Sequence, residues 1–203
     1  MTDAAMPAEL SDRLQATDAA LAARVALGDA AALAPLYQRY RAPVYRFALL
    51  WSGQAAVAAD VTQDVFLHLL GHAGDFDAAR GPLQPWLLGI ARNFVHRRTG
   101  ADARFVANDD DAEPAAPDLD APTPESALAL QRDVARLRAA IAALPPHYRD
   151  VLVLVELAER SYAEAAAICG CELNTVRSRL SRARGLVARW LEATPASDRA
   201  AKG

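Results

Sequence analysis

Hydrophobic positions recur at helical spacing through most of this chain. In residues 33–50 and again in residues 55–70, apolar side chains return every three or four positions, as they do on one face of a helix. A third stripe consists of Val176, Leu180, Ala183 and Val187. We find no convincing strand-like alternation of apolar and polar residues, and much of the apolar content is alanine, which favours helix. The pattern therefore predicts an all-α fold.

The third stripe belongs to a helix whose other sides are rich in arginine and serine. The opposite face and its two flanks carry Arg177, Ser178, Arg179, Ser181, Arg182 and Arg184. Arginine matches guanine edges and phosphates, and serine bonds to either, so such a face fits the major groove of DNA. A solvated amphipathic helix has the same pattern, and the stripe alone does not separate the two interpretations.

A short helix is predicted immediately before this one. Ser161 is placed as its N-cap, with Glu164 three residues later, which is the pattern of a capping box. Gly170 permits the left-handed conformation that ends a helix, and we expect Asn174 to cap the next one. Two short helices around a glycine-containing turn, the second of them basic, form a helix-turn-helix. This arrangement favours DNA recognition.

The N-terminal half is predicted to contain several further helices. Gly28 and Asp29 mark the end of one helix and the start of the next. The run from residue 33 to residue 50 contains Pro35 and Pro43, which we expect to interrupt and kink it.

The helix predicted for residues 55–70 has two distinct faces. Its buried stripe is expected to contain Val57, Val61, Val65, Phe66, Leu69 and Leu70. Asp60, Gln63 and Asp64 lie away from that stripe. They form either a solvated face or a docking face for a basic partner surface.

A loop at residues 74–85 leads into a helix at residues 86–98. We expect Leu87, Ile90, Ala91 and Phe94 to face inward and Arg92, Asn93, His96 and Arg97 to face outward. Basic and amide side chains beside aromatic rings suit unpaired bases, which stack on rings and bond through their edges.

An acidic stretch divides the chain. Residues 101–125 hold eight acids, one arginine and four prolines, without apolar periodicity, which predicts a disordered linker. The chain has a net charge of −3, so the sequence outside this stretch is basic. The predicted organisation is a disordered segment at 1–17, a helical domain at 18–99, the linker at 100–124, a second helical domain at 125–192 and a tail at 193–203.

Composition narrows the class of protein further. No apolar run approaches the ~20 residues that cross a membrane. The acidic N-terminus lacks the features of a secretion signal. Two cysteines, Cys169 and Cys171, indicate a reducing compartment rather than a disulfide framework, so we expect a cytoplasmic protein.

Metal and catalytic interpretations have little support in the sequence. His68 and His72 have the i, i+4 spacing of zinc ligands, but no glutamate accompanies them. Cys169 and Cys171 do not form a Cys-x-x-Cys motif; we expect Cys169 to pack in the helix-turn-helix core, with a regulatory thiol as the alternative. Asp60 and Asp64 have no nucleophile or phosphate-binding loop beside them. We therefore expect neither catalysis nor a cofactor.

Taken together and in order, several short strings resemble the extracytoplasmic-function (ECF) sigma factors of bacterial RNA polymerase. They are Gly28-Asp29, Asp60–Phe66, Phe76-Asp77 with Ala79–Gly81, Trp86-Leu87 with Ile90–Asn93, Leu144-Pro145, Ser161-Tyr162 with Glu164, and Thr175–Arg179 with Arg182–Arg184. The resemblance covers about residues 18 to 192.

This resemblance implies a role for each group of residues. Core-polymerase binding falls to Asp60, Gln63 and Asp64. Recognition of the separated −10 promoter element falls to Phe76, Asp77, Arg80, Trp86, Arg92, Asn93, His96 and Arg97. Recognition of the −35 element falls to Arg149, Asn174, Thr175, Arg177, Ser178, Arg179, Ser181 and Arg182, with Arg149 and Arg179 on phosphates.

The implied partners are core RNA polymerase, through its β′ clamp helices and β flap, promoter DNA, and an anti-sigma factor. Membrane insertion and a small-molecule substrate are not implied. Trp86 stands alone where primary sigma factors carry two adjacent tryptophans, which suggests dependence on a close promoter match.

Two other classes of protein compete with this interpretation. A free-standing regulator with the same helix-turn-helix would not need the strings at 60–66 and 86–93. An adaptor that does not contact DNA would leave the outward Arg177, Arg182 and Arg184 unexplained.

Overall fold

Every regular element in residues 17–100 and 125–194, the ranges that the computed structural model describes, is a helix. The predicted all-α fold is thus confirmed for these ranges. The predicted acidic linker at 101–124, and nearly all of the predicted N-terminal segment and tail, lie outside them. The helices divide into two units. Of the described residues, one unit holds 17–49 and 54–95, and the other holds 50–53, 96–100 and 125–194.

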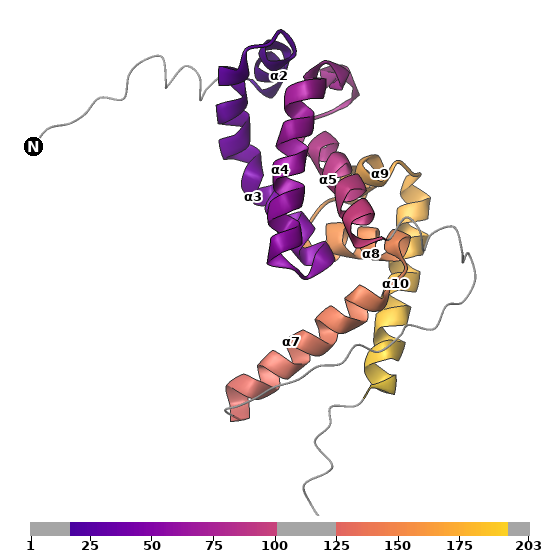
Figure 1. Ribbon diagram of the computed structural model, residues 1–203. Helices are drawn as coiled ribbons and strands as arrows, with labels where there is room; N and C mark the ends of the chain where they lie inside the picture. The colour runs from indigo at the N-terminus through magenta and orange to yellow at the C-terminus, as the bar shows by residue number, and fades with distance from the viewer. Residues whose placement is uncertain (1–16, 101–124, 195–203) are drawn as a thin grey trace, which may run out of the picture. The chain divides into compact units, whose positions relative to one another are not determined.

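The first unit is built from helices of the N-terminal half (Figure 1). In chain order these are α2 (Asp18–Ala26), η1 (Ala30–Ala32), α3 (Leu33–Ser52), α4 (Ala55–His72), η2 (Ala73–Asp75), η3 (Ala78–Arg80) and α5 (Leu83–Thr99), of which α3 and α5 end in the second unit. Its core is aliphatic and aromatic, with Leu21, Leu36, Phe47, Val61, Val65, Leu69, Leu83, Leu87 and Leu88 among its buried side chains.

The start of the first unit follows the predicted break at Gly28 and Asp29. Gly28 has a φ of 89°, a left-handed conformation that glycine adopts without steric cost. The Asp29 carboxylate accepts a hydrogen bond from the Ala31 backbone N–H at 3.0 Å and so caps η1. Asp29 also accepts from Arg24, and that hydrogen bond lowers the pKa of the Asp29 carboxyl.

Helix α3 is continuous through both of its prolines. Pro35 lies in the first turn, where a backbone N–H has no intrahelical acceptor to lose. Pro43 lies in the interior, and the helix runs on to Ser52. The predicted interruption is therefore wrong, because the apolar stripe on either side of Pro43, with Leu36, Val44 and Phe47 all buried, stabilises one helix.

Besides the ends of α3 and α5, the described part of the second unit contains five helical elements, two of them long. They are α7 (Glu125–Ala143), α8 (Pro146–Leu152), the π-helical turn η4 (Val153–Leu157), α9 (Tyr162–Cys169) and α10 (Leu173–Ala193). Ala139 and Ala140 of α7 form a buried cluster with Trp190 of α10, and Val187 and Leu191 pack around it. Small alanines on α7 leave room for the indole of Trp190, which joins the two long helices.

Arg136 ties α7 to the end of α10. Its guanidinium donates to the backbone carbonyl of Leu191 at 2.9 Å and to that of Thr194. These carbonyls belong to the last turn of α10, which has no intrahelical donor for them. A cation at this end also matches the negative end of the helix dipole.

No helix in the described ranges is long and apolar enough to cross a membrane.

Candidate nucleic-acid and protein interfaces

Helix α4 exposes a mixed acidic and apolar face. Asp60 and Gln63 are exposed and Asp64 is half-buried, as the sequence predicts. Leu67 and Leu70 are 57% and 42% exposed on the same helix, so the expectation that Leu70 is buried is wrong. The buried side of α4 consists of Ala58, Val61, Thr62, Val65, Phe66 and Leu69, which leaves these two leucines outside the core. Apolar side chains among acids are typical of a surface that binds another protein.

The segment after α4 holds two neighbouring aromatic rings. Phe76 follows η2, and its ring lies 5.6 Å from that of Trp86 in α5, measured between ring centroids. Asp77 caps η3 through its carboxylate, which accepts the Ala79 amide at 2.9 Å. Both rings are half-buried, and Arg80 is exposed. The segment therefore offers π-faces and a cation to a ligand, the combination that unpaired bases bind.

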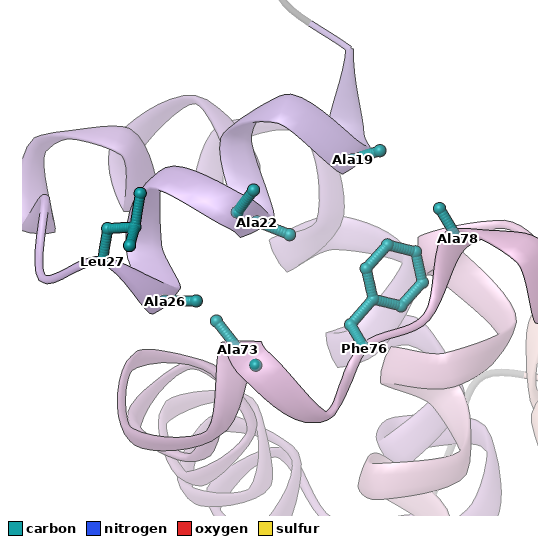
Figure 2. Close-up of a pocket in the computed structure, with 9 residues that line it drawn as sticks. Ala19, Ala22, Ala26, Leu27, Ala73, Phe76 and Ala78 are labelled. Carbon is teal, nitrogen blue, oxygen red and sulfur yellow. The ribbon is translucent and has the colours of Figure 1, made fainter.

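A groove of 360 Å³ lies beside Phe76. Figure 2 shows it between α2 and the segment from Ala73 to Ala78. It is lined by Ala19, Ala22, Ala23, Ala26, Leu27, Ala73, Gly74, Phe76 and Ala78. None of these side chains can donate or accept a hydrogen bond, so they offer apolar contact, and any polar recognition in the groove must come from backbone groups.

The polar residues of α5 are not all presented to solvent. Asn93 and Arg97 are exposed, and Arg92 is half-buried. His96 is buried, so the expectation that it faces outward is wrong. Its Nε2 lies 2.8 Å from Oδ1 of Asp150, and the Asp150 carboxylate is itself buried.

Asp150 joins a buried polar cluster inside the second unit. Besides meeting His96, its Oδ1 accepts a hydrogen bond from Nε1 of Trp51 at 2.8 Å. Arg149 stacks over the Trp51 ring, with its Cζ 4.4 Å from the centroid. Arg149 also donates to the Leu144 carbonyl at 3.1 Å and to the Ala142 carbonyl. A buried carboxylate with two donors is stable where an unpaired one would not be.

This cluster bears on two sequence predictions. The family resemblance assigns His96 and Arg149 to DNA contacts, but both side chains are buried in the protein. Nothing in the sequence pattern indicates the cluster, because Trp51 and His96 lie 99 and 54 residues from Asp150. Asp150 and Trp51 are therefore residues that sequence reasoning missed.

The helix-turn-helix forms as its local signals predict, with one exception. Ser161 and Glu164 make both bonds of the capping box, at 2.9 Å and 3.2 Å, and the Ser161 bonds lower the pKa of Glu164. Gly170 ends α9 with a φ of 62°. Asn174 does not cap α10; Glu172 holds that position, without a side-chain bond, and Asn174 lies inside the helix.

Helix α10 separates an apolar face from a basic one. Val176, Leu180 and Ala183 are buried, as predicted, and Val187 is half-buried. Among the polar residues at 174–184, Asn174, Arg177, Ser178, Ser181, Arg182 and Arg184 are exposed, whereas Thr175 and Arg179 are half-buried. The structure therefore brings most of the predicted −35 residues onto one solvent-facing side of one helix.

The described residues contain no group of three or more side chains suited to hold a metal ion. The rings of His68 and His72 stack with centroids 4.2 Å apart. Cys169 and Cys171 are half-buried and are not joined in a disulfide.

Comparisons with known proteins match both halves of the chain. Residues 36–104 match Sigma-70 region 2, and residues 135–186 match Sigma-70, region 4. The chain is 35% identical over 176 residues to the probable RNA polymerase sigma-C factor of Mycobacterium bovis, covering 81% of this chain and 86% of that one. It is 34% identical over 152 residues to the ECF RNA polymerase sigma factor EcfG of Rhodopseudomonas palustris, covering 75% and 81%.

A solved structure agrees with these matches. The structure of CnrH in complex with the cytosolic domain of CnrY superposes with a TM-score of 0.62 and 27% sequence identity, covering 88% of this chain and 99% of CnrH. The chain therefore belongs to the ECF subfamily of RNA polymerase sigma factors, the proteins that direct the initiation of transcription.

Proposed function

We propose that this sigma factor binds core RNA polymerase through α4 and reads promoter DNA through two separate surfaces, one in each unit. The observation that carries the proposal is the division of α10 into a buried apolar stripe and an exposed Arg/Ser face. A helix with that division, following the short helix α9 across a glycine turn, has the geometry in which a recognition helix enters a major groove.

The polymerase-binding surface in this proposal is the exposed side of α4. Asp60, Gln63 and Asp64 supply its polar part, and Leu67 and Leu70 supply apolar contact area. Negative charge here suits a basic partner surface and would repel DNA phosphates. This charge therefore favours a basic protein surface over DNA as the partner of the face.

The −10 surface consists of the aromatic segment and the exposed part of α5. Phe76 and Trp86 provide rings for unstacked bases, and Arg80 and Asn93 are exposed and able to contact backbone and base edges. Asp77 holds the turn between the rings by capping η3. His96 is left out of this surface because it is buried on Asp150.

The −35 surface consists of the exposed side of α10. Arg177 and Arg182 supply the charge for guanine edges or phosphates, and Ser178 and Ser181 lie between them. Arg149 is left out, because its guanidinium is bonded to the backbone carbonyls at the end of α7. The sigma factor itself carries out no catalytic step in this proposal; the polymerase supplies the active site.

Further partners and location follow from this role. A protein that works on core polymerase and promoter DNA acts in the bacterial cytoplasm. An anti-sigma factor is a further expected partner. The related CnrH is seen with another protein chain, the cytosolic domain of CnrY.

Run-off transcription tests the proposal. Purified full-length protein is added to bacterial core RNA polymerase and a library of promoter fragments, and RNA 5′ ends are mapped. We expect defined start sites that appear only when both proteins are present. DNA binding without polymerase association, as a free-standing regulator would show, would contradict the proposal.

A further inference from the structure

Three exposed arginines of α10 are held by side chains of different chemistry. Arg177 donates to Oδ1 of Asn174 at 3.2 Å. Arg182 donates to the hydroxyl of Tyr148 at 3.3 Å, and Arg184 bonds to the carboxylate of Glu156, with its Nε 3.1 Å from Oε1. Two of these contacts are therefore made to neutral oxygens, and the third is made to an acid.

Arg184 is committed to Glu156. Both Nε and Nη2 of Arg184 reach the same carboxylate oxygen, and this pairing raises the pKa of Arg184. An arginine that shares its charge with a carboxylate attracts phosphate less strongly, and two of its nitrogens already donate to Glu156. Glu156 thus directs Arg184 toward the protein and away from a ligand.

Tyr148 makes a different kind of contact with Arg182. Its hydroxyl oxygen carries no charge and accepts a hydrogen bond from Nη1 of the guanidinium. Arginine has about 2 kcal/mol of rotamer entropy, and a contact that restricts its conformations reduces what must be lost when it binds a base.

The position of Tyr148 is itself fixed by its surroundings. It lies on α8, two residues after Pro146 begins that helix. The next residue, Arg149, is bonded to the Leu144 carbonyl, and Val151 and Leu152 are buried. These neighbours therefore hold the backbone of Tyr148 in α8, and its hydroxyl meets a flexible side chain on α10.

We propose that Tyr148 is a positioning residue for DNA recognition: it orients Arg182 toward base edges of the upstream promoter duplex, while Glu156 withholds Arg184 from the same duplex. This inference rests on the proposed function, since it deepens the assignment of α10 to the −35 element. It adds a residue from outside the recognition helix to the determinants of promoter specificity.

The variant Tyr148→Phe tests it, because it removes the hydroxyl and keeps the ring. The holoenzyme of full-length protein and core polymerase is bound to its mapped promoter and to −35 fragments with single base substitutions. Discrimination is measured as the affinity for the intact −35 element divided by that for the substituted element that binds most weakly. We expect this ratio to fall about fivefold, which corresponds to the loss of one solvated hydrogen bond to a charged group. The slope of affinity against salt concentration stays the same, since no phosphate contact is removed.

A double-mutant cycle separates positioning from a direct contact. If Tyr148 acts through Arg182, Tyr148→Phe has no further effect on the ratio in an Arg182→Ala background. A full effect of Tyr148→Phe in that background would overturn the proposal. So would an unchanged ratio in the single variant, or a reduced salt slope, which would make Tyr148 a phosphate contact.

Glu156→Gln serves as the matched control on the acid-held arginine. This change removes the carboxylate partner of Arg184. We expect base discrimination at the −35 element to stay the same within experimental error, and the slope of affinity against salt concentration to become steeper on all DNA fragments. A fall in discrimination as large as that of Tyr148→Phe would contradict the distinction between the two arginines. If the unmodified holoenzyme binds no defined promoter, the proposed function fails instead, and that outcome is visible before any variant is measured.

Discussion

Helix α4 of the first unit and helix α10 of the second are both amphipathic, and each buries a stripe at three- and four-residue steps. The stripes are chemically alike: Val61, Val65 and Leu69 in α4, and Val176 and Leu180 in α10. The exposed sides are opposite in sign, with carboxylates on α4 and guanidinium groups on α10. The buried stripe therefore determines how each helix packs, and the exposed side determines which partner it binds.

The largest predicted effect is a loss of stability when the buried apolar stripe of α4 or of α10 is truncated. Leu69→Ala and Leu180→Ala should each lower the free energy of unfolding by about 2–5 kcal/mol, because a buried leucine leaves a cavity when truncated. Urea unfolding followed by circular dichroism measures this. Leu67→Ala is the control, since that side chain is 57% exposed, and its cost should stay below about 1 kcal/mol. An equal cost for Leu67→Ala would show that the exposed side of α4 also packs.

The next effect concerns the basic side of α10. Arg182→Ala should weaken binding to the cognate −35 element by about 1–3 kcal/mol and relax the base preference there. Promoter-variant transcription with reconstituted holoenzyme measures both quantities. Arg184→Ala is the matched control, because Arg184 is already bonded to Glu156. If both variants lose the same amount of promoter binding, Arg182 and Arg184 do not differ in their role in DNA recognition.

The acidic side of α4 gives a smaller effect on a different partner. The double reversal Asp60→Arg and Asp64→Arg should weaken association with core polymerase at least about tenfold, since like charges would face each other across the interface. Pull-down or fluorescence titration of core polymerase measures this. Asp75→Arg, an exposed acid outside α4, is the control and should bind as the unmodified protein does. Full binding by the double variant would mean that this face is merely solvated.

The smallest effect is on the pH dependence of the first unit. The Tyr40 hydroxyl donates to Asp18, and burial together with that carboxylate raises the pKa of Tyr40 from 10.0 to about 12. A raised pKa stabilises the fold below the unfolded value of 10.0, and this contribution is lost as the pH rises toward 12. The stabilities of the unmodified protein and of Tyr40→Phe should therefore converge between pH 10 and pH 12. A constant difference over that range would exclude this contribution.

Local signals in the sequence predict local structure well. The capping box of Ser161 and Glu164, the left-handed Gly170 and the stripe of Val176, Leu180 and Ala183 all depend on residues a few positions apart. Short-range geometry determines such features, so the residues of the helix-turn-helix are sufficient to predict it. The family resemblance carried by these strings is confirmed by the matches to Sigma-70 regions 2 and 4.

Features that depend on distant residues cannot be predicted in the same way. The position of His96 on α5 predicts an outward side chain, but Asp150 provides a buried acceptor for it. The residue type of Asn174 predicts a cap, but the turn after Gly170 puts Glu172 at that position. The contacts of Arg182 with Tyr148 and of Arg184 with Glu156 join residues 34 and 28 positions apart. The helical pattern shows which arginines lie on the exposed side, and only the folded chain shows how each is held.

Footprinting of promoter DNA by the reconstituted holoenzyme tests whether one chain holds polymerase through α4 while it contacts the −10 element through the aromatic segment with α5 and the −35 element through α10. We expect two protected segments, at the −10 and −35 elements, that appear together, with Arg182→Ala weakening the upstream one and the α4 charge reversal weakening both. Protection that persists without core polymerase, or that is lost from both elements on Arg182→Ala while holoenzyme assembly is intact, would contradict it.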